Sequence, residues 1–263
     1  MVVRRITYYP IDLYEGITGK RNAMVPPKGM IYVGAGDFLS QGKRLTNLVV
    51  KHTGFQPDGT LLDVGCGIGR LAIALTEYIS PRGQYYGFDI VKKGIEWCEK
   101  KVASRFPNFH FLHIDLKNDL YNLTTNAEAR EFKFPYKADT FDTIVLTSVF
   151  THMMPDDVQN YLHEIAKVMK ADGKCFATFF ILNKHSEQEM NQGKAYFNFK
   201  HTYDGYALLS RKVKEADVAY DEARLLQMID KAGLEPVRII YGEWCNSADG
   251  EDFQDIVVLR RKK

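Results

Sequence analysis

Apolar and β-branched runs alternate with helical patterns over most of the chain, which is typical of βαβ units around a largely parallel sheet. Strands are expected at residues 60–64, 84–88, 109–114, 141–146, 174–181, 237–241 and 255–259. Helices are expected at residues 69–79, 91–105, 156–169 and 220–232. The last two strands are close enough in sequence to pair antiparallel. The pattern therefore predicts a doubly wound α/β fold with a mostly parallel, seven-stranded sheet and an antiparallel last strand.

The charge of the chain is balanced, with 35 Lys and Arg against 33 Asp and Glu residues and a formal net charge of +2. Such a chain has no strong overall field, so we expect neither nucleic acid nor a membrane as partner. The apolar runs are too short for a membrane helix, and the four widely spaced cysteines favour a reducing cytoplasm. The four cysteines form no C-x-x-C pair and no other cluster has ligand spacing, so we expect no metal. No signal indicates an oligomeric state.

Three alternating glycines follow the first predicted strand directly. Gly65, Gly67 and Gly69 lie between that strand and the next helix, in the run LLDVGCGIGR at residues 61–70. Glycine lets the main chain turn sharply and lets a ligand lie against it, where a Cβ atom would collide. The free N–H groups at the start of the helix favour a negative group on that ligand. The loop, including Cys66, is therefore a candidate cofactor site.

An acidic residue strengthens this interpretation. Asp89 ends the second predicted strand, twenty residues after Gly69. A carboxylate there can accept hydrogen bonds from both hydroxyls of a ribose. The pair does not separate S-adenosylmethionine (SAM) from NAD, because residues 67–72 also fit the dinucleotide pattern G-x-G-x-x-A.

Residues 60–181 resemble the class I SAM-dependent methyltransferases. The first motif of that family, an acidic residue followed by G-x-G-x-G, is matched by Asp63 and the three glycines. Asp89 matches its ribose-binding acid and Asp115 its adenine-contacting acid. The resemblance implies a Rossmann-like fold, SAM as cofactor, and these cofactor-binding residues: Asp63, Gly65, Cys66, Gly67, Gly69, Asp89, Ile90, Asp115, Leu116 and Thr147. Asp63 could instead hold the glycine turn through backbone amides.

Shorter stretches are similar to a group of bacterial methyltransferases without an agreed substrate; they lie at residues 87–91, 95–98, 107–109 and 148–153. Such enzymes often accompany glycan or secondary-metabolite synthesis. One departure from the family is Ala171-Asp172, where a Pro-Gly-Gly turn is usual. Asp-Gly still bends the chain, so we expect the preceding helix to stop at a turn over residues 171–173.

Two stretches lie outside the alternating pattern. Residues 1–59 precede the first strand, and we expect them to form an arm that covers the cofactor site. Residues 183–219 are polar, aromatic and too long for an ordinary connection, so we expect an irregular cap on the acceptor side, which we call the cap segment. The SAM-binding core would then comprise residues 60–182 and be completed by residues 220–263.

His152 is the candidate general base. It lies just beyond the fourth predicted strand, at the sheet edge where α/β folds bind ligands, and its ordinary pKa suits neutral pH. The alternative is that His152 only supports the loop that enters the next helix. The aromatic residues of the cap segment could line the acceptor pocket, or they could form a minor core or a dimer contact. Trp244 could line the same pocket or only plug the edge of the sheet.

The function that these residues favour is transfer of the SAM methyl to a small acceptor. A hydroxyl of a glycan-like or secondary-metabolite molecule is the first expectation, because a candidate base and aromatic side chains are present. Nitrogen and carbon acceptors fit the same residues. A non-catalytic SAM-binding protein is the main alternative, and an NAD-dependent oxidoreductase is a weaker one, since it gives no reason for Asp115 or the antiparallel last strand.

Overall fold

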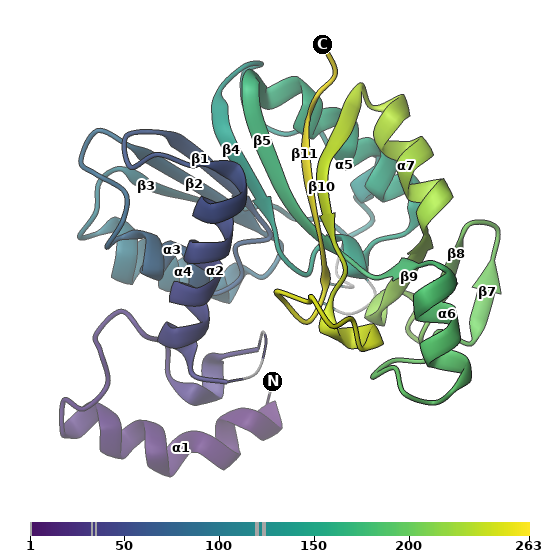
Figure 1. The fold of residues 1–263 in the computed structure, drawn as a ribbon. Coiled ribbons are helices and arrows are strands. Elements are labelled where there is room, and N and C mark those ends of the chain that lie inside the picture. The colour runs from purple at the N-terminus through teal and green to yellow at the C-terminus, as the bar shows by residue number, and fades with distance from the viewer. Residues whose placement is uncertain (1, 33, 35, 119–120, 123–124) are drawn as a thin grey trace. The chain divides into compact units, whose positions relative to one another are not determined.

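The computed structural model describes residues 2–32, 34, 36–118, 121–122 and 125–263. Within these residues, one sheet has seven strands in the order β10-β11-β5-β4-β1-β2-β3 (Figure 1). Their bounds are Thr60–Val64 (β1), Gln84–Asp89 (β2), Phe109–His113 (β3), Phe141–Leu146 (β4), Met169–Phe179 (β5), Leu234–Ile240 (β10) and Asp255–Arg261 (β11). β4 pairs parallel with β1 and β5, whereas β11 pairs antiparallel with both β5 and β10. The predicted fold class is thus confirmed.

The chain divides into two compact units. Unit 1 comprises residues 1–59 and 66–114, and unit 2 comprises residues 60–65 and 115–263. Besides β2 and β3, unit 1 contains the helices α1 (Val2–Ile17), α2 (Phe38–Thr53), α3 (Arg70–Leu75) and α4 (Lys92–Cys98) and a short 3-10 turn, η1 (Lys28–Met30). The expected division into arm, core and cap stays a prediction.

Helix α2 has clear local signals at both ends. Asp37 caps its first turn by accepting a hydrogen bond from Ser40 N at 2.9 Å, and Gly54, with φ +73°, ends it. A Cβ atom at Gly42 would lie 2.7 Å from the carbonyl oxygen of Arg70, so glycine permits the close packing of α2 on α3.

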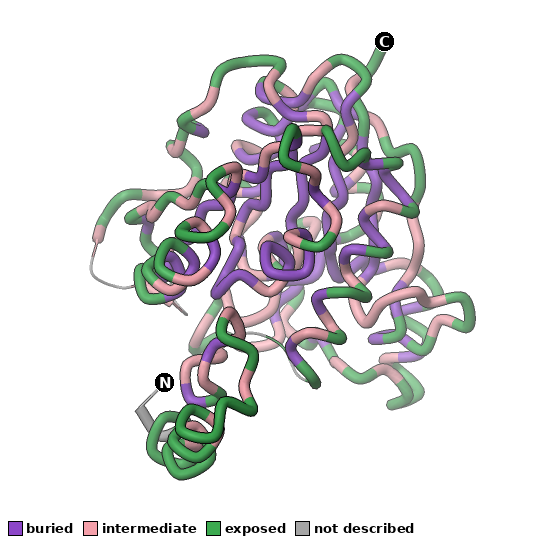
Figure 2. The backbone as a smooth tube through the Cα atoms, turned by 90° about the vertical axis from the view of Figure 1, so that its left-hand side faces the viewer, coloured by how far each residue is buried: buried purple, intermediate pink, exposed green. Residues whose placement is uncertain are grey.

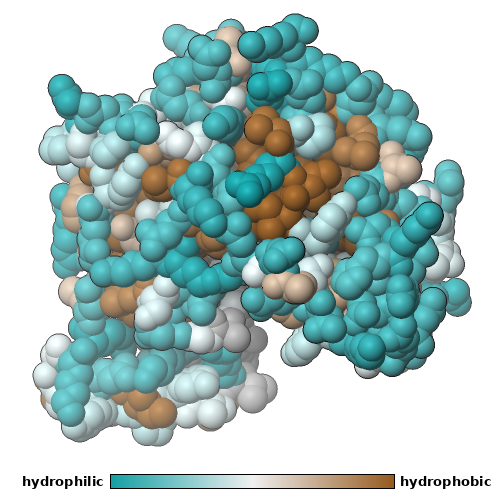
Figure 3. All heavy atoms as spheres, viewed as in Figure 1, coloured by the Kyte–Doolittle hydropathy of each residue, from teal (hydrophilic) through white to brown (hydrophobic). Residues whose placement is uncertain are grey.

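Unit 2 packs two helices against its strands, α5 (Pro155–Val168) and α7 (Glu222–Lys231) (Figure 1). Helix α5 begins with Pro155 and two acidic residues, as the sequence predicts. Figure 3 shows apolar side chains gathered over β10 and β11, surrounded by polar surface. No helix in the described part of the chain has both the length and the apolar character needed to cross a membrane.

The cap segment is ordered, and the expectation of irregular structure was wrong. It contains α6 (Lys184–Asn191) and contributes to a second sheet in the order β6-β9-β8-β7, with bounds Ile181–Leu182 (β6), His201–Tyr203 (β7), Tyr206–Leu208 (β8) and Val218–Asp221 (β9). Asn183 Oδ1 caps α6 by accepting from the backbone N of His185 and Ser186, both at 3.0 Å. Asp204-Gly205 forms a two-residue hairpin turn between β7 and β8, a signal that the aromatic density of the segment obscured.

Some element boundaries differ from the predicted ones. The helix expected to reach residue 105 changes after Cys98 into a π-helical turn, Glu99–Ala103. The turn expected at residues 171–173 lies inside β5, where the pairing jumps from Phe141↔Met169 to Thr143↔Lys174. The sheet therefore accommodates the Asp-Gly bend as a bulge and continues on either side of it.

Candidate functional site

The glycine loop of unit 1 depends on backbone conformations that other residues avoid. Gly67 and Gly69 have φ values of +59° and +84°. A Cβ atom at Gly69 would lie 2.7 Å from the Sγ atom of Cys98, which no ordinary contact allows. Cys66 is buried, and its backbone N donates a hydrogen bond to Phe88 O at 3.0 Å. The loop is therefore tied to β2 and packs closely on α4, which leaves no room for a Cβ atom at Gly69.

Asp89 holds this loop directly. Its Oδ2 accepts a hydrogen bond from Gly67 N at 2.7 Å, and its Oδ1 accepts one from Val91 N at 2.7 Å. The residue is only 8% exposed, and burial raises the pKa of its carboxyl above the ordinary value. Each carboxylate oxygen has a further lone pair, so the predicted contact with ribose hydroxyls stays compatible with these two bonds.

The residues that follow Asp89 complete this part of unit 1. Ile90 is half-buried, and its carbonyl oxygen lies 3.3 Å from His113 Nε2. The backbone N of Ile114 donates to Asp89 O at 3.0 Å. The end of β2 is therefore fixed to the end of β3, next to the Asp89 carboxylate that holds the glycine loop.

The remaining motif residues of β1 belong to unit 2. Asp63 is buried, with 2% of its surface exposed, and lies opposite Val145 in the parallel pair β1–β4. Gly65 has φ +73°, and a Cβ atom there would come within 2.5 Å of Val149 Cγ2. The chain thus leaves β1 in a conformation and a space that only glycine fits.

Three other predicted cofactor residues differ in exposure. Asp115 is exposed, and its Oδ1 accepts a hydrogen bond from Asn122 Nδ2 at 2.9 Å. Leu116 is buried, and its carbonyl oxygen accepts from the same nitrogen at 2.9 Å. Thr147 is half-buried, directly after β4. Asp115 therefore offers a carboxylate to solvent, in contrast to buried Asp89.

His152 lies in a short 3-10 turn, η4 (Phe150–His152), and is held on several sides. Its Nδ1 is 3.0 Å from the carbonyl oxygen of Glu215, and the ring of Tyr121 stands edge-on to it at 5.9 Å. Asn118 Nδ2 donates to the His152 carbonyl at 3.1 Å. Burial lowers the pKa of the imidazole. Because a carbonyl only accepts, Nδ1 carries the proton in the neutral ring and Nε2 carries the lone pair.

A polar cluster next to the end of β4 was missed from the sequence. Ser148 has φ +55°, uncommon for a residue other than glycine. Its backbone N donates to Thr178 Oγ1 at 2.8 Å, and its hydroxyl donates to Gln254 Oε1 at 3.0 Å. The Thr178 hydroxyl donates to the same Oε1 at 2.6 Å. Two hydroxyl protons thus orient the Gln254 amide, with Nε2 as its donor end. No local pattern signals a contact between segments so far apart in sequence.

Part of the aromatic cap forms a minor core. Trp244 is fully buried, and its ring contacts Phe180 and Phe199 with centroid distances of 5.4 and 5.6 Å. Its Nε1 donates to Asp255 Oδ2 at 2.9 Å. Tyr196, in contrast, is 74% exposed. Trp244 and Phe199 therefore have a packing role, as members of one buried cluster.

Asp255 anchors the base of the cap segment. Its carboxylate also accepts from the backbone N of Ile181 and of Gly242, both at 2.6 Å. Burial raises the pKa of this carboxyl to about 6, although the three donors oppose that shift.

Within the described residues, no group of three or more His, Cys, Asp or Glu side chains is placed to hold a metal ion, and metal independence stays a prediction.

Comparison with known proteins agrees with this geometry. Residues 62–177 match the family model described as "Methyltransferase domain". The 2-phytyl-1,4-naphtoquinone methyltransferase of Trichormus variabilis is 25% identical over 55% of this chain and 57% of its own length. The demethylmenaquinone methyltransferase of Lysinibacillus sphaericus is 27% identical over 73% of this chain and 76% of that protein.

Solved structures share the fold. The 1,6-didemethyltoxoflavin-N1-methyltransferase of Burkholderia thailandensis was solved with bound 1,6-didemethyltoxoflavin and S-adenosylhomocysteine. It aligns with a TM-score of 0.53 at 16% identity, covering 100% of this chain and 88% of that one. Residues 62–177 of the chain therefore match a methyltransferase domain, and the methyltransferase fold that the chain shares supports SAM as cofactor. A loop of left-handed glycines, kept clear of Cβ atoms, and a buried acid at the end of β2 fit that cofactor.

Proposed function

We propose that this chain uses its methyltransferase domain to methylate an aromatic small molecule of the quinol class. The two relatives described above are named for a phytyl-naphthoquinone and for demethylmenaquinone. A quinone ring is electron-poor, so the form that attacks a methyl group is the reduced, hydroxylated ring. The observation that carries the proposal is the His152 imidazole, whose Nδ1 is fixed by Glu215 and whose Nε2 keeps its lone pair.

The proposed reaction is an in-line displacement. When bound, SAM supplies a methyl group on a positively charged sulfur, which leaves with the bonding electron pair as a neutral thioether. Catalysis then depends on holding the acceptor atom behind the methyl group. Residues 65–69, Asp89 and Asp115 would hold the cofactor.

His152 would accept the proton of the acceptor hydroxyl at Nε2, which raises the electron density of the ring carbon that attacks the methyl group. That carbon would then lose its own hydrogen as a proton to solvent, which restores the aromatic ring. The Glu215 carbonyl would stabilise the imidazolium through the Nδ1–H bond at 3.0 Å. Burial lowers the pKa of His152, so the neutral, proton-accepting form is the one present at neutral pH. The ring of Tyr121 stands edge-on to the imidazole, with 5.9 Å between the ring centroids. It would give an aromatic acceptor a ring to pack against beside the base.

The Ser148–Thr178–Gln254 cluster would orient the acceptor. With Oε1 occupied by two hydroxyl donors, the Gln254 amide presents Nε2–H, which suits an oxygen of a quinol. Gln254→Glu keeps the acceptor for both hydroxyls and removes that donor. We expect the variant to raise the KM for the acceptor about tenfold with an unchanged Kd for SAM.

The direct test uses methyl-labelled SAM and the purified chain with reduced 1,4-naphthoquinones that carry short prenyl tails. A panel of sugars forms the second arm, because His152 would serve a glycan-like hydroxyl, the acceptor expected from the sequence, equally well. Label on the quinol ring, located by NMR of the product, supports the proposal. Label on sugars alone, or on neither class despite measured SAM binding, would refute the quinol assignment.

A further inference from the structure

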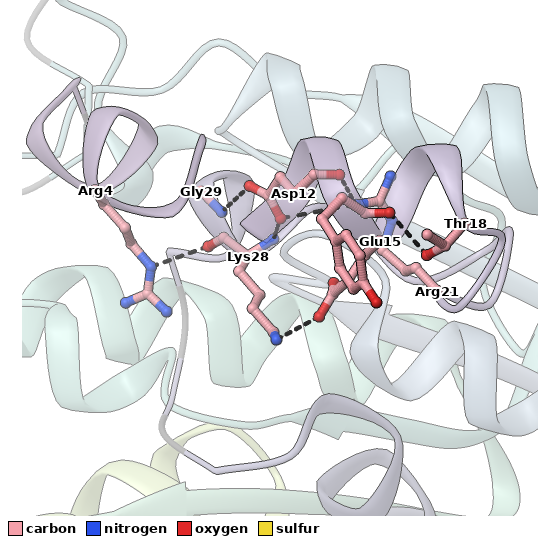
Figure 4. A network of polar contacts seen from close by, with 8 residues as sticks. Arg4, Asp12, Glu15, Thr18, Arg21, Lys28 and Gly29 are labelled. Carbon is pink, nitrogen blue, oxygen red and sulfur yellow. Dashed lines mark hydrogen bonds and ion pairs between the residues drawn. The ribbon is translucent and has the colours of Figure 1, made fainter. Parts of the chain in front are cut away.

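The N-terminal helix α1 contacts its neighbours through its polar face (Figure 4). Of its described side chains, those of intermediate exposure are Tyr8, Asp12 and Glu15. Asp12 accepts hydrogen bonds from the backbone N of Lys28 at 2.6 Å and of Gly29 at 2.9 Å. Glu15 forms an ion pair with Lys28 Nζ at 2.6 Å. The inner side of this helix is therefore charged and hydrogen-bonded.

The opposite face of α1 is apolar and exposed. Spacings of three and four residues place Ile6, Tyr9, Leu13 and Ile17 along one side of the helix. Their exposed fractions are 71, 64, 48 and 77%. Figure 2 shows this helix as a mostly exposed coil beside the N-terminus. An amphipathic helix in a globular protein normally turns its apolar stripe inward, so the reversed orientation indicates a further partner.

The net charge of the segment that contains α1 favours an anionic partner. Residues 1–30 contain five basic side chains and two acidic ones, a formal charge of +3, whereas the whole chain carries +2. The remainder of the chain is therefore slightly acidic, and the net positive charge lies in the same segment as the apolar stripe. Apolar side chains with neighbouring Lys and Arg residues are typical of helices that lie in the interface of an anionic lipid bilayer. Tyr9, with an apolar ring and a polar hydroxyl, suits the level of the headgroups.

We propose that α1 rests on the surface of an anionic membrane, with its apolar stripe in the boundary between headgroups and acyl chains. This contact requires no membrane-crossing helix. The balanced charge of the whole chain, from which we expected no membrane partner, does not describe the charge of residues 1–30. The short apolar runs speak against a spanning segment and do not bear on a helix that lies in the surface. The proposal rests on residues of unit 1 alone and does not depend on the proposed methyl transfer. If the acceptor carries a lipid tail, contact with a membrane would bring the enzyme to it.

The test is flotation of the full chain with vesicles, without acceptor. Vesicles of phosphatidylcholine mixed with phosphatidylglycerol should bind the chain, pure phosphatidylcholine vesicles should bind it much less, and high salt should release it. Ile6→Ser with Ile17→Ser should lower the apparent partition coefficient at least about tenfold. The matched control is Leu112→Ser with Val237→Ser, two apolar side chains that are 39% and 46% exposed elsewhere, and it should bind like the wild type.

Equal binding by the variant and the control would overturn the proposal, as would no binding to anionic vesicles. A dimer that sedimentation detects in the wild type and not in the α1 variant, without vesicle binding, would assign the stripe to a second copy of this chain instead. SAM affinity is measured in the same samples and should stay unchanged. A failure here therefore leaves the proposed methyl transfer intact, and a failure of methyl transfer leaves vesicle binding intact.

Discussion

The glycine loop of unit 1 and the His152 region of unit 2 are built in different ways. The loop is made of backbone: left-handed glycines and amide N–H groups held by one buried carboxylate, all within residues 66–91. The His152 region is made of side chains and carbonyls from distant segments, since Glu215 is 63 residues away. A cofactor that many enzymes share can be bound by the same backbone geometry in each of them. An acceptor that is specific to one enzyme requires side chains whose positions differ from enzyme to enzyme.

The largest expected effect concerns turnover and the proposed base, His152. His152→Asn keeps an N–H donor near the position of Nδ1 and removes the base. We expect kcat to fall about a hundredfold and the Kd for SAM to stay unchanged. Steady-state kinetics with isothermal titration of SAM measure both. The control is His163→Asn on exposed helix surface, which should leave both values intact. A kcat near that of the wild type would remove His152 from the mechanism.

The next effect concerns the buried carboxylate of the loop. Asp89→Ala leaves the backbone N–H groups of Gly67 and Val91 without their acceptor, so we expect a loss of about 2–5 kcal/mol in the free energy of unfolding. The affinity for SAM should fall more than tenfold. Urea denaturation and SAM titration provide the two readouts. Asp115→Ala is the control, because its exposed carboxylate should change stability by less than about 0.5 kcal/mol. Equal stability of the two variants would contradict the role assigned to Asp89.

A smaller effect separates backbone strain from steric collision. Gly69→Ala and Gly193→Ala both place a Cβ atom on a left-handed residue, with φ +84° and +68°, which costs roughly 1 kcal/mol. Only the first meets a neighbour, Cys98 Sγ, whereas the space around Gly193 is open. We expect the Kd for SAM to rise several-fold in Gly69→Ala alone. Titration of both variants tests this, and a similar rise in Gly193→Ala would show that general destabilisation is the cause.

The smallest expected effect is a pH dependence. Burial lowers the pKa of His152, so the unfolded chain takes up a proton at a higher pH than the folded one. The stability contribution of this group is therefore complete above the ordinary histidine pKa of about 6.5 and is lost as the pH falls below it. Free energies of unfolding, measured from neutral to mildly acid pH, should converge between the wild type and His152→Asn. Curves that stay parallel would argue against the lowered pKa.

The sequence predicted what local backbone chemistry determines. The strand before Gly65, the acid at the end of the second strand and the antiparallel last strand all appear as expected. These features depend on neighbouring residues and on hydrophobic periodicity, which a single sequence displays.

The parts that were missed depend on long-range contacts. The Ser148–Gln254 hydrogen bond joins residues 106 positions apart, and no periodicity carries such information. The cap segment was expected to be irregular because its Asn183 cap and its Asp204-Gly205 turn lie among many aromatic residues. The burial of Trp244 depends on a bond to Asp255, which only the closed fold brings together.

Isothermal titration of the full chain with SAM, S-adenosylhomocysteine and NAD in parallel tests the central claim most directly. We expect both adenosyl ligands to bind at a single site and NAD not to bind, because Asp89 and the three glycines belong to a methyltransferase domain. Binding of NAD in their place, or of none of the three ligands, would contradict the assignment of the glycine loop as a SAM site.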